Sequence, residues 1–180
     1  MSEVAVYVRE ATGPDDRSLL ADAISETSGC DSSAVEIEYR CLRCGSVGHG
    51  KPHVVEPAGY FVSLSRSAGL VAVAVTDGAP VGIDITRIDA VARADVSAVL
   101  RHSDDDAVTP IEIARSWAAK EAVLKATGWG LHIDPSELAV VGGQLVLWPA
   151  QLELDEAPEV DHFEVGDEVV GAVAFVVVGD

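Results

Sequence analysis

The chain has 180 residues, enough for one large domain or two small ones. Its 30 acidic residues outnumber its 12 basic ones and the net charge is −18, which argues against broad binding to nucleic acids or anionic membranes. The most apolar run, Val169–Val178, is too short to span a membrane. Three cysteines do not make a disulfide framework and no signal peptide is visible, so we expect a cytoplasmic protein.

The first half of the chain reads as one helix followed by several strands. Apolar residues share one face of Asp15–Ser28, and Gly29 follows them, which predicts a short helix. Cys41–Pro52 is expected to be a loop. Strands are predicted at Val35–Tyr39, Tyr60–Ser65, Leu70–Thr76 and Val81–Ile85. The turn signal Asp77-Gly78 predicts a hairpin over Leu70–Ile85.

The second half begins with helices and ends with strands. Ala90–Leu100 is expected to be helical, and a clearer helix starts at the capping box of Thr109 and Glu112 and stops at Gly128. The segments after it are predicted as a hairpin at Leu138–Val141 and Gln144–Trp148, an acidic surface excursion at Ala150–Asp167, and a central strand at Val169–Val178. This order favours an α+β fold, with helices segregated from largely antiparallel sheets.

The few lysines are unevenly placed. The chain has only Lys51, Lys120 and Lys125, and no lysine or arginine follows Lys125. Any anion site is therefore expected in the first two thirds of the chain. On the predicted helix, Glu121 and Lys125 are four residues apart and share a face with Trp117, an arrangement that can also be an ordinary stabilising side-chain pair.

An acidic residue interrupts an apolar strand. Asp84 points to the opposite face from Ile83 and Ile85, and burying it is costly unless it is paired or holds a cation. A strand Asp and a helix Glu, here Asp84 and Glu121, can jointly bind magnesium, which is commonly held by one or two carboxylates and substrate phosphates.

Four blocks, in this order, resemble the signature of the surfactin-type 4'-phosphopantetheinyl transferase family. The blocks are Gly50-Lys51-Pro52, Ser63-Leu64-Ser65-Arg66-Ser67, Gly82-Ile83-Asp84-Ile85, and a helix with Trp117, Lys120-Glu121-Ala122, Lys125 and Gly128. The resemblance spans Gly50 to Gly128. Before Gly50, Arg17 and Arg40 are the candidates for further phosphate contacts.

The resemblance implies a single domain over residues 1–180, a monomer of two pseudo-twofold α+β halves (about 1–80 and 81–180) with coenzyme A in the cleft between them. It implies transfer of the phosphopantetheine arm of coenzyme A to a serine of an apo acyl or peptidyl carrier protein, with magnesium or manganese. The residues that would bind coenzyme A are Lys51, Pro52, Ser65, Arg66, Lys120 and Lys125. Asp84 and Glu121 would hold the metal, Glu121 would take the serine proton, and Lys125 would neutralise the leaving 3',5'-ADP.

Two positions depart from the family pattern. Thr86 stands where the family has a second acidic residue on the strand. With Thr86 as the third metal ligand, the metal site has one negative charge fewer. Arg66 replaces a histidine, and arginine binds phosphate well. The Thr86 change leaves open a catalytically weakened or inactive homologue that binds coenzyme A or a carrier protein.

A loop rich in cysteine and histidine offers another kind of site. Cys41, Cys44, His49 and His53 have a spacing that could hold structural zinc, or the two cysteines could be a free thiol pair. A small zinc-dependent interaction domain is the unrelated alternative function. Cys30 is expected to be a lone buried thiol. Ser65 or Ser67 with a histidine would make a hydrolase site, but a nucleophile-elbow context is missing.

Overall fold

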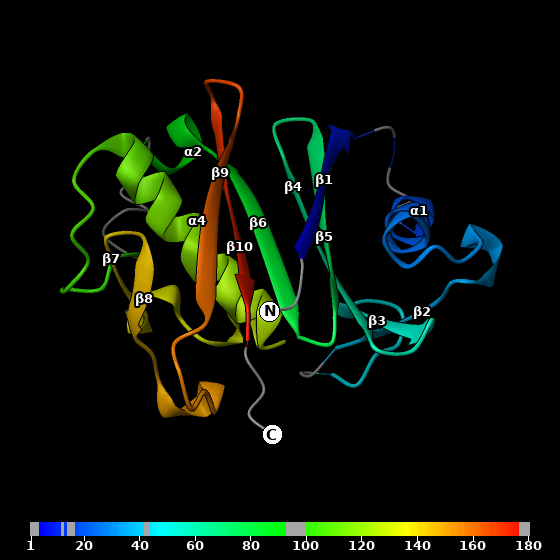
Figure 1. Cartoon of the computed structure of the whole chain (residues 1–180). Coiled ribbons are helices and arrows are strands. Elements are labelled where there is room, and N and C mark those ends of the chain that lie inside the picture. The colour runs from blue at the N-terminus through cyan, green and yellow to red at the C-terminus, as the bar shows by residue number, and fades with distance from the viewer. Residues whose placement is uncertain (1–3, 12, 14–16, 42–43, 93–99, 177–180) are drawn as a thin grey trace.

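The computed structural model describes residues 4–11, 13, 17–41, 44–92 and 100–176. The fold is α+β: two three-stranded sheets stand near the middle of the molecule, and helices lie at their outer sides (Figure 1). The strands of the first sheet end at Asp77, and those of the second begin at Val81. In the described part of the chain, none of the helices has the length and apolar character needed to cross a membrane.

The first sheet has the strand order β1-β5-β4 and is antiparallel. Helix α1 packs on it through Leu20, Ala23 and Ile24, the same face that the sequence pattern predicts. A separate two-stranded ribbon, β2-β3, lies beyond this sheet. The elements are β1 (Val4–Glu10), α1 (Arg17–Ser28), β2 (Glu36–Arg40), β3 (Lys51–Glu56), β4 (Tyr60–Ser67) and β5 (Leu70–Asp77).

The second sheet has the order β6-β10-β9, so the apolar strand β10 is central, as the sequence predicts. The long helix α4 crosses this sheet, and the short hairpin β7-β8 packs against the helix. The elements are β6 (Val81–Arg87), α2 (Ile88–Ala92), α4 (Pro110–Ala126), β7 (Ala139–Val141), β8 (Gln144–Leu147), β9 (Glu159–Val165) and β10 (Val169–Phe175).

Three expectations about the strands are wrong. Leu70–Ile85 is not a hairpin, because both edges of β5 are already paired, with β1 and β4, and β6 pairs with β10 instead. The acidic segment Ala150–Asp167 contains the edge strand β9, and Cys41–Pro52 is not all loop because β3 starts at Lys51. The N-terminal strand β1 was not predicted. Most of the predicted helix Ala90–Leu100 lies outside the described residues.

The two sheets meet along β4 and β6, where side chains replace a backbone ladder. The hydroxyl of Ser63 accepts a hydrogen bond from the backbone N–H of Ile83 at 3.1 Å, and that of Ser65 accepts one from Ile85 at 3.2 Å. A buried cluster that draws on β5, β6 and β10 closes the seam. The seam therefore sets β4 beside the strand that carries Asp84.

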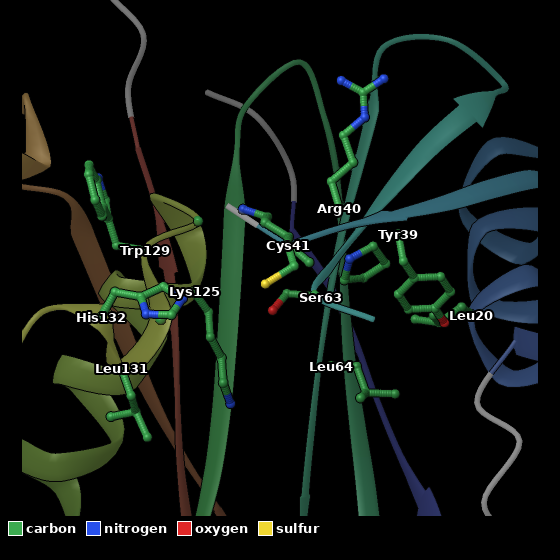
Figure 2. Close-up of a pocket in the computed structure, with 15 residues that line it drawn as sticks. Leu20, Tyr39, Arg40, Cys41, Ser63, Leu64, Lys125, Trp129, Leu131 and His132 are labelled. Atoms are coloured by element: carbon green, nitrogen blue, oxygen red, sulfur yellow. The ribbon is translucent and has the colours of Figure 1, made fainter. Parts of the chain in front are cut away.

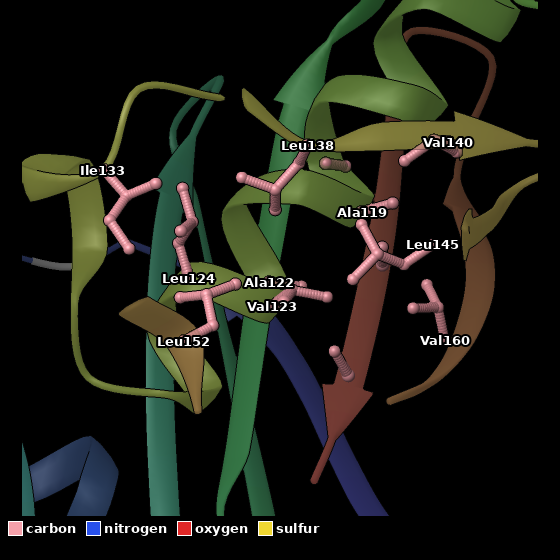
Figure 3. Close-up of a cluster of buried hydrophobic side chains, with 13 residues drawn as sticks. Ala119, Ala122, Val123, Leu124, Ile133, Leu138, Val140, Leu145, Leu152 and Val160 are labelled. Atoms are coloured by element: carbon pink, nitrogen blue, oxygen red, sulfur yellow. The ribbon is translucent and has the colours of Figure 1, made fainter. Parts of the chain in front are cut away.

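Helix α4 is buried over most of its surface. Its capping box forms as predicted: the Thr109 hydroxyl accepts from the Glu112 N–H, and the Glu112 carboxylate accepts from the Thr109 N–H. The helix fills a core with side chains from β7, β8 and β9, which Figure 3 shows around Ala119, Ala122 and Val123. Gly82 of β6 lets the helix lie close, since a Cβ there would overlap the carbonyl oxygen of Ala122.

Candidate functional site

Asp84 lies between strand β6 and helix α4. Strand alternation puts Asp84 and Thr86 on the same face as Gly82, which is the face that α4 covers. Asp84 is 6% exposed and Thr86 is 8% exposed. The sequence prediction that this acid points away from Ile83 and Ile85 agrees with that placement.

The carboxylate of Asp84 is paired and hydrogen bonded. The Lys125 ammonium donates to Asp84 Oδ1 at 2.7 Å and to the carbonyl of Ile83 at 3.1 Å. The Ser65 hydroxyl donates to the same Asp84 oxygen, also at 2.7 Å. A buried charge needs such compensation, so Lys125 and Ser65 are what make an aspartate tolerable on this apolar strand.

Glu121 has much less compensation. It lies one helical turn before Lys125, is 7% exposed, and its Oε1 has no hydrogen-bond partner among the described residues. Burial raises the pKa of Glu121 to about 7; the ammonium of Lys125 lowers it and the neighbouring charge of Asp84 raises it further. A carboxyl poised near neutral pH is suited to accept a proton or a cation.

The arrangement of the two acids fits a divalent cation in part. Asp84 and Glu121 come from facing elements and are close enough for the charge of one to act on the other. A cation would satisfy the orphaned oxygen of Glu121, and carboxylate oxygens suit magnesium. Thr86 lies two residues further along the same face of β6 and offers a neutral hydroxyl where an acid would be a stronger ligand.

A cleft opens beside this group, between the strands β2, β3 and β4 and the segment that follows α4 (Figure 2). It encloses about 290 Å³. Arg40, Lys51 and Lys125 bring positive charge to its wall, and Leu64 and Trp129 bring apolar surface. In a protein of net charge −18, a gathering of three cations is a suitable place for an anionic ligand.

Lys51 reaches from β3 across the cleft to the end of α4. Its ammonium donates to the carbonyl of Ala126 at 2.6 Å, one of the carbonyl groups that the helix end leaves without a helical partner. Burial lowers the pKa of Lys51 to about 8. Lys51 and Pro52, two of the residues expected to bind coenzyme A, both line the cleft.

Three of the residues expected to bind coenzyme A do not line the cleft among the described residues. Lys120 is 1% exposed, and its ammonium donates to Asp105 at 2.6 Å and to the Leu100 carbonyl at 3.0 Å. The hydroxyl of Ser65 donates a hydrogen bond to Asp84 and accepts one from the N–H of Ile85. Arg66 is exposed and, by strand alternation, lies on the opposite face of β4 from Ser65.

Trp117 and Arg17, two other residues that the sequence singles out, are also absent from the described cleft wall. Trp117 packs in a core cluster with Val91 and Val170, so it does not form part of the cleft wall. Arg17 lies over the ring of Tyr39, with its guanidinium carbon 5.2 Å from the ring centre. Arg40 does line the cleft. Because Ser65 bonds to Asp84 rather than to a histidine, the hydrolase reading of this serine finds no support.

The sequence interpretation missed one wall of the cleft. Trp129, Gly130, Leu131 and His132 line it directly after the end of α4. Leu131 is 66% exposed, which is unusual for a leucine beside a cleft. A tryptophan between two glycines immediately after the most informative helix, at Gly128-Trp129-Gly130, was the signal that could have identified this wall.

Only part of the proposed zinc site comes together. The ligand atoms of Cys41, Cys44 and His49 all lie within 4.8 Å of one another. His53 is not in this group: it lies on β3, paired with Glu38, and lines a neighbouring cavity. Cys30 is half-buried rather than buried, and the Ser28 hydroxyl donates to its sulfur at 3.1 Å.

One comparison with known proteins bears on this site. Residues 80–145 match the family model of the 4'-phosphopantetheinyl transferase superfamily. The matched stretch contains β6 and α4, and therefore Asp84, Glu121 and Lys125. No curated protein matches the sequence significantly. Over this stretch the chain is thus similar to the 4'-phosphopantetheinyl transferase superfamily, while the resemblance to the surfactin-type family rests on the sequence blocks described above.

Proposed function

We propose that this protein transfers the 4'-phosphopantetheine arm of coenzyme A to a serine of an apo carrier protein. The observation that carries the proposal is the group formed by the buried Asp84 and Glu121 and the half-buried Lys125, which also lines a cleft that contains Arg40 and Lys51. Strand β6 and helix α4 thus bring two carboxylates and an ammonium together beside a cleft with cationic side chains. The superfamily match over residues 80–145 agrees with this reading.

The cleft suits the nucleotide end of coenzyme A. Lys51 and Arg40 line the cleft and would bind phosphate groups, and the apolar wall at Trp129 would take the adenine ring. Lys125 borders both this cleft and the carboxylate pair. A coenzyme A molecule bound here would place its pyrophosphate near Lys125.

The transfer exchanges one phosphorus–oxygen bond for another. The serine oxygen of the carrier attacks the phosphorus that bears pantetheine, the bond from that phosphorus to the oxygen of 3',5'-ADP breaks, and the serine proton passes to Glu121. Its pKa of about 7 suits Glu121 to this role, since part of the population is ionised at neutral pH. Lys125 neutralises the charge that develops on the leaving 3',5'-ADP.

Asp84 and Glu121 would hold the magnesium that such enzymes use, with Thr86 beside them. Bound there, the metal would neutralise charge on the pyrophosphate. The neutral Thr86 is expected to weaken metal binding, and manganese could serve in place of magnesium. Thr86 is also the feature that favours the second candidate, an inactive homologue that binds coenzyme A or a carrier protein without transfer.

The test is to mix the protein with coenzyme A, magnesium or manganese, and apo-carriers from fatty-acid, polyketide and peptide synthesis. We expect at least one carrier to gain the mass of the phosphopantetheine arm. If coenzyme A binds but no carrier gains mass at any metal concentration, the binding homologue replaces the enzyme. If neither binding nor transfer is found, both proposals fail.

We expect the affinity for coenzyme A to fall as the pH rises through about 8. Lys51 has a pKa of about 8 in the folded protein, so it is charged below this pH and neutral above it. Lys51→Met should weaken binding by roughly 10-fold to 100-fold at pH 7, since a hydrogen bond to a charged group contributes about 1.5–3 kcal/mol. Calorimetric titration with coenzyme A between pH 6.5 and 9 measures both effects.

The matched control for Lys51 is Arg9→Ala. This change also removes one cation, but from an exposed pair with Glu26 on α1, and it should leave affinity within a factor of two. The pH dependence above 7.5 should shrink in Lys51→Met and persist in Arg9→Ala. Equal pH dependence in the two variants would show that Lys51 does not bind the ligand.

A further inference from the structure

The loop between β2 and β3 is mostly exposed over the residues described from Cys44 to Gly50. Among its described residues from Cys44 to Gly50, only Ser46 is partly buried, and Val47 is 73% exposed. Its hydrogen bonds are local: Cys41 N–H donates to the Ser46 carbonyl at 3.0 Å, and Gly45 N–H donates to the Cys41 carbonyl at 2.9 Å. The residues described from Cys44 to Gly50 therefore give the loop little buried apolar surface, and small structures with little core are commonly stabilised by a metal or a disulfide.

Three soft ligand groups meet on this loop. Cys44 Sγ lies 3.4 Å from His49 Nε2, and all three ligand atoms of Cys41, Cys44 and His49 lie within 4.8 Å of one another. With bonds of about 2.3 Å from zinc to sulfur and about 2.0 Å from zinc to nitrogen, tetrahedral geometry puts sulfur and nitrogen ligands roughly 3.5 Å apart. The observed separation of Cys44 and His49 is close to that value.

We propose that Cys41 Sγ, Cys44 Sγ and His49 Nε2 bind one zinc ion, with a water molecule in the fourth position. Thiolate and imidazole ligands favour zinc over magnesium or calcium. Gly45, directly after Cys44, has a positive φ of 68°, and its N–H donates to the carbonyl of Cys41, so the backbone there turns back toward Cys41. His53 is excluded as the fourth ligand, because β3 carries it away from the other three.

The metal would hold two strand ends together. Arg40 and Lys51 are opposite each other in the register of β2 and β3, directly outside the loop. Gly50 packs so closely there that a Cβ would overlap the carbonyl oxygen of Arg40. Cys41 itself lines the cleft beside Arg40 and Lys51, so zinc would keep these two cations in place. This consequence rests on the proposed function, but the metal site does not.

The first experiment measures the metal directly. The full-length protein is produced without a histidine tag in zinc-supplemented growth medium and purified under reducing conditions. Inductively coupled plasma mass spectrometry should then find about one zinc ion per chain. Cys44→Ala and His49→Ala should lose most of this zinc. His53→Ala is the matched control, since it removes a neighbouring histidine outside the group, and it should retain the metal. Circular dichroism of each variant reports whether it is folded.

The second experiment does not depend on the folding of variants. Titration of the metal-free wild type with cobalt(II) should produce a thiolate-to-cobalt charge-transfer band in the near ultraviolet and strong visible bands typical of four-coordinate cobalt. Zinc should abolish both sets of bands at one equivalent. Neither measurement involves coenzyme A or transfer, so failure of the zinc site and failure of the proposed function can be told apart.

Three results would overturn the proposal. One is a reduced wild type that contains no zinc and gives no thiolate-to-cobalt band. Another is a thiol count under native conditions that shows Cys41 and Cys44 joined as a disulfide in the freshly purified protein. The third is a His53→Ala variant that loses as much zinc as His49→Ala, which would move the site to a different set of ligands.

Discussion

Glu121→Gln is expected to abolish transfer and at the same time to stabilise the metal-free protein at pH 8. Glutamine has a similar helix propensity but cannot accept the serine proton or ligate a cation as a carboxylate does. Loss of a general base alone costs about 100-fold to 10,000-fold in rate. Mass gain of the carrier over time measures this loss, and near-normal turnover would remove Glu121 from the mechanism.

The gain in stability follows from the raised pKa of Glu121. The folded value is about 7 against an ordinary 4.5, so the folded protein binds more protons than the unfolded chain between these pH values. The wild type therefore loses stability as the pH rises from about 4.5 to about 7, and the loss is complete above 7. This difference in the pKa of Glu121 corresponds to on the order of 3 kcal/mol.

Denaturant unfolding at pH 5 and pH 8, without divalent metal, tests the stability effect. The free energy of unfolding of Glu121→Gln should exceed that of the wild type at pH 8, and most of this difference should disappear at pH 5. Glu137→Gln, which changes an exposed glutamate, is the control and should show no such difference. If the free energy of unfolding depends on pH equally in the wild type and in Glu121→Gln, ionisation of Glu121 costs the folded protein little free energy and its pKa is not raised.

Asp105→Ala should destabilise the protein severely, by about 3–5 kcal/mol, because it leaves a buried charge without its partner. Asp105 and Lys120 have side chains that are each 1% exposed, with 2.6 Å between the carboxylate and the ammonium. Asp105 also accepts from the N–H of His102 at 2.9 Å and of Val140 at 2.8 Å. One carboxylate thus joins the segment before α4, the helix itself and strand β7.

Denaturant or thermal unfolding measures this second effect. Asp104→Ala is the neighbouring control: its side chain is 64% exposed, and its loss should change stability by no more than about 0.5 kcal/mol. Adding Lys120→Met to Asp105→Ala should recover part of the loss, since it removes the unpaired ammonium. If Asp105→Ala unfolds like the wild type, water has access to Lys120 and the pair is not a structural anchor.

Local patterns in the sequence determined the parts of this protein that depend on near neighbours. The capping box of Thr109 and Glu112, the end of α4 just before Gly128 and the central strand Val169–Phe175 were all predictable. So was the side of the strand to which Asp84 points, because alternation in a strand follows from the backbone alone. Edge strands were harder to predict. Polar and apolar residues do not alternate cleanly through His162 and Phe163 of β9, and the sequence pattern did not reveal this strand.

Only the tertiary structure decided which functional residues meet. Lys120 and Lys125 lie on the same helix, and the sequence pattern marks both as candidates to bind coenzyme A. In the structure Lys120 is buried in an ion pair with Asp105, whereas Lys125 borders the cleft. A helix buried on nearly all sides has no polar face by which the sequence could distinguish the two lysines. Likewise, Arg40 and Trp129 come from opposite halves of the chain. They share a cleft wall only because the two sheets meet along β4 and β6, a contact between residues far apart in sequence.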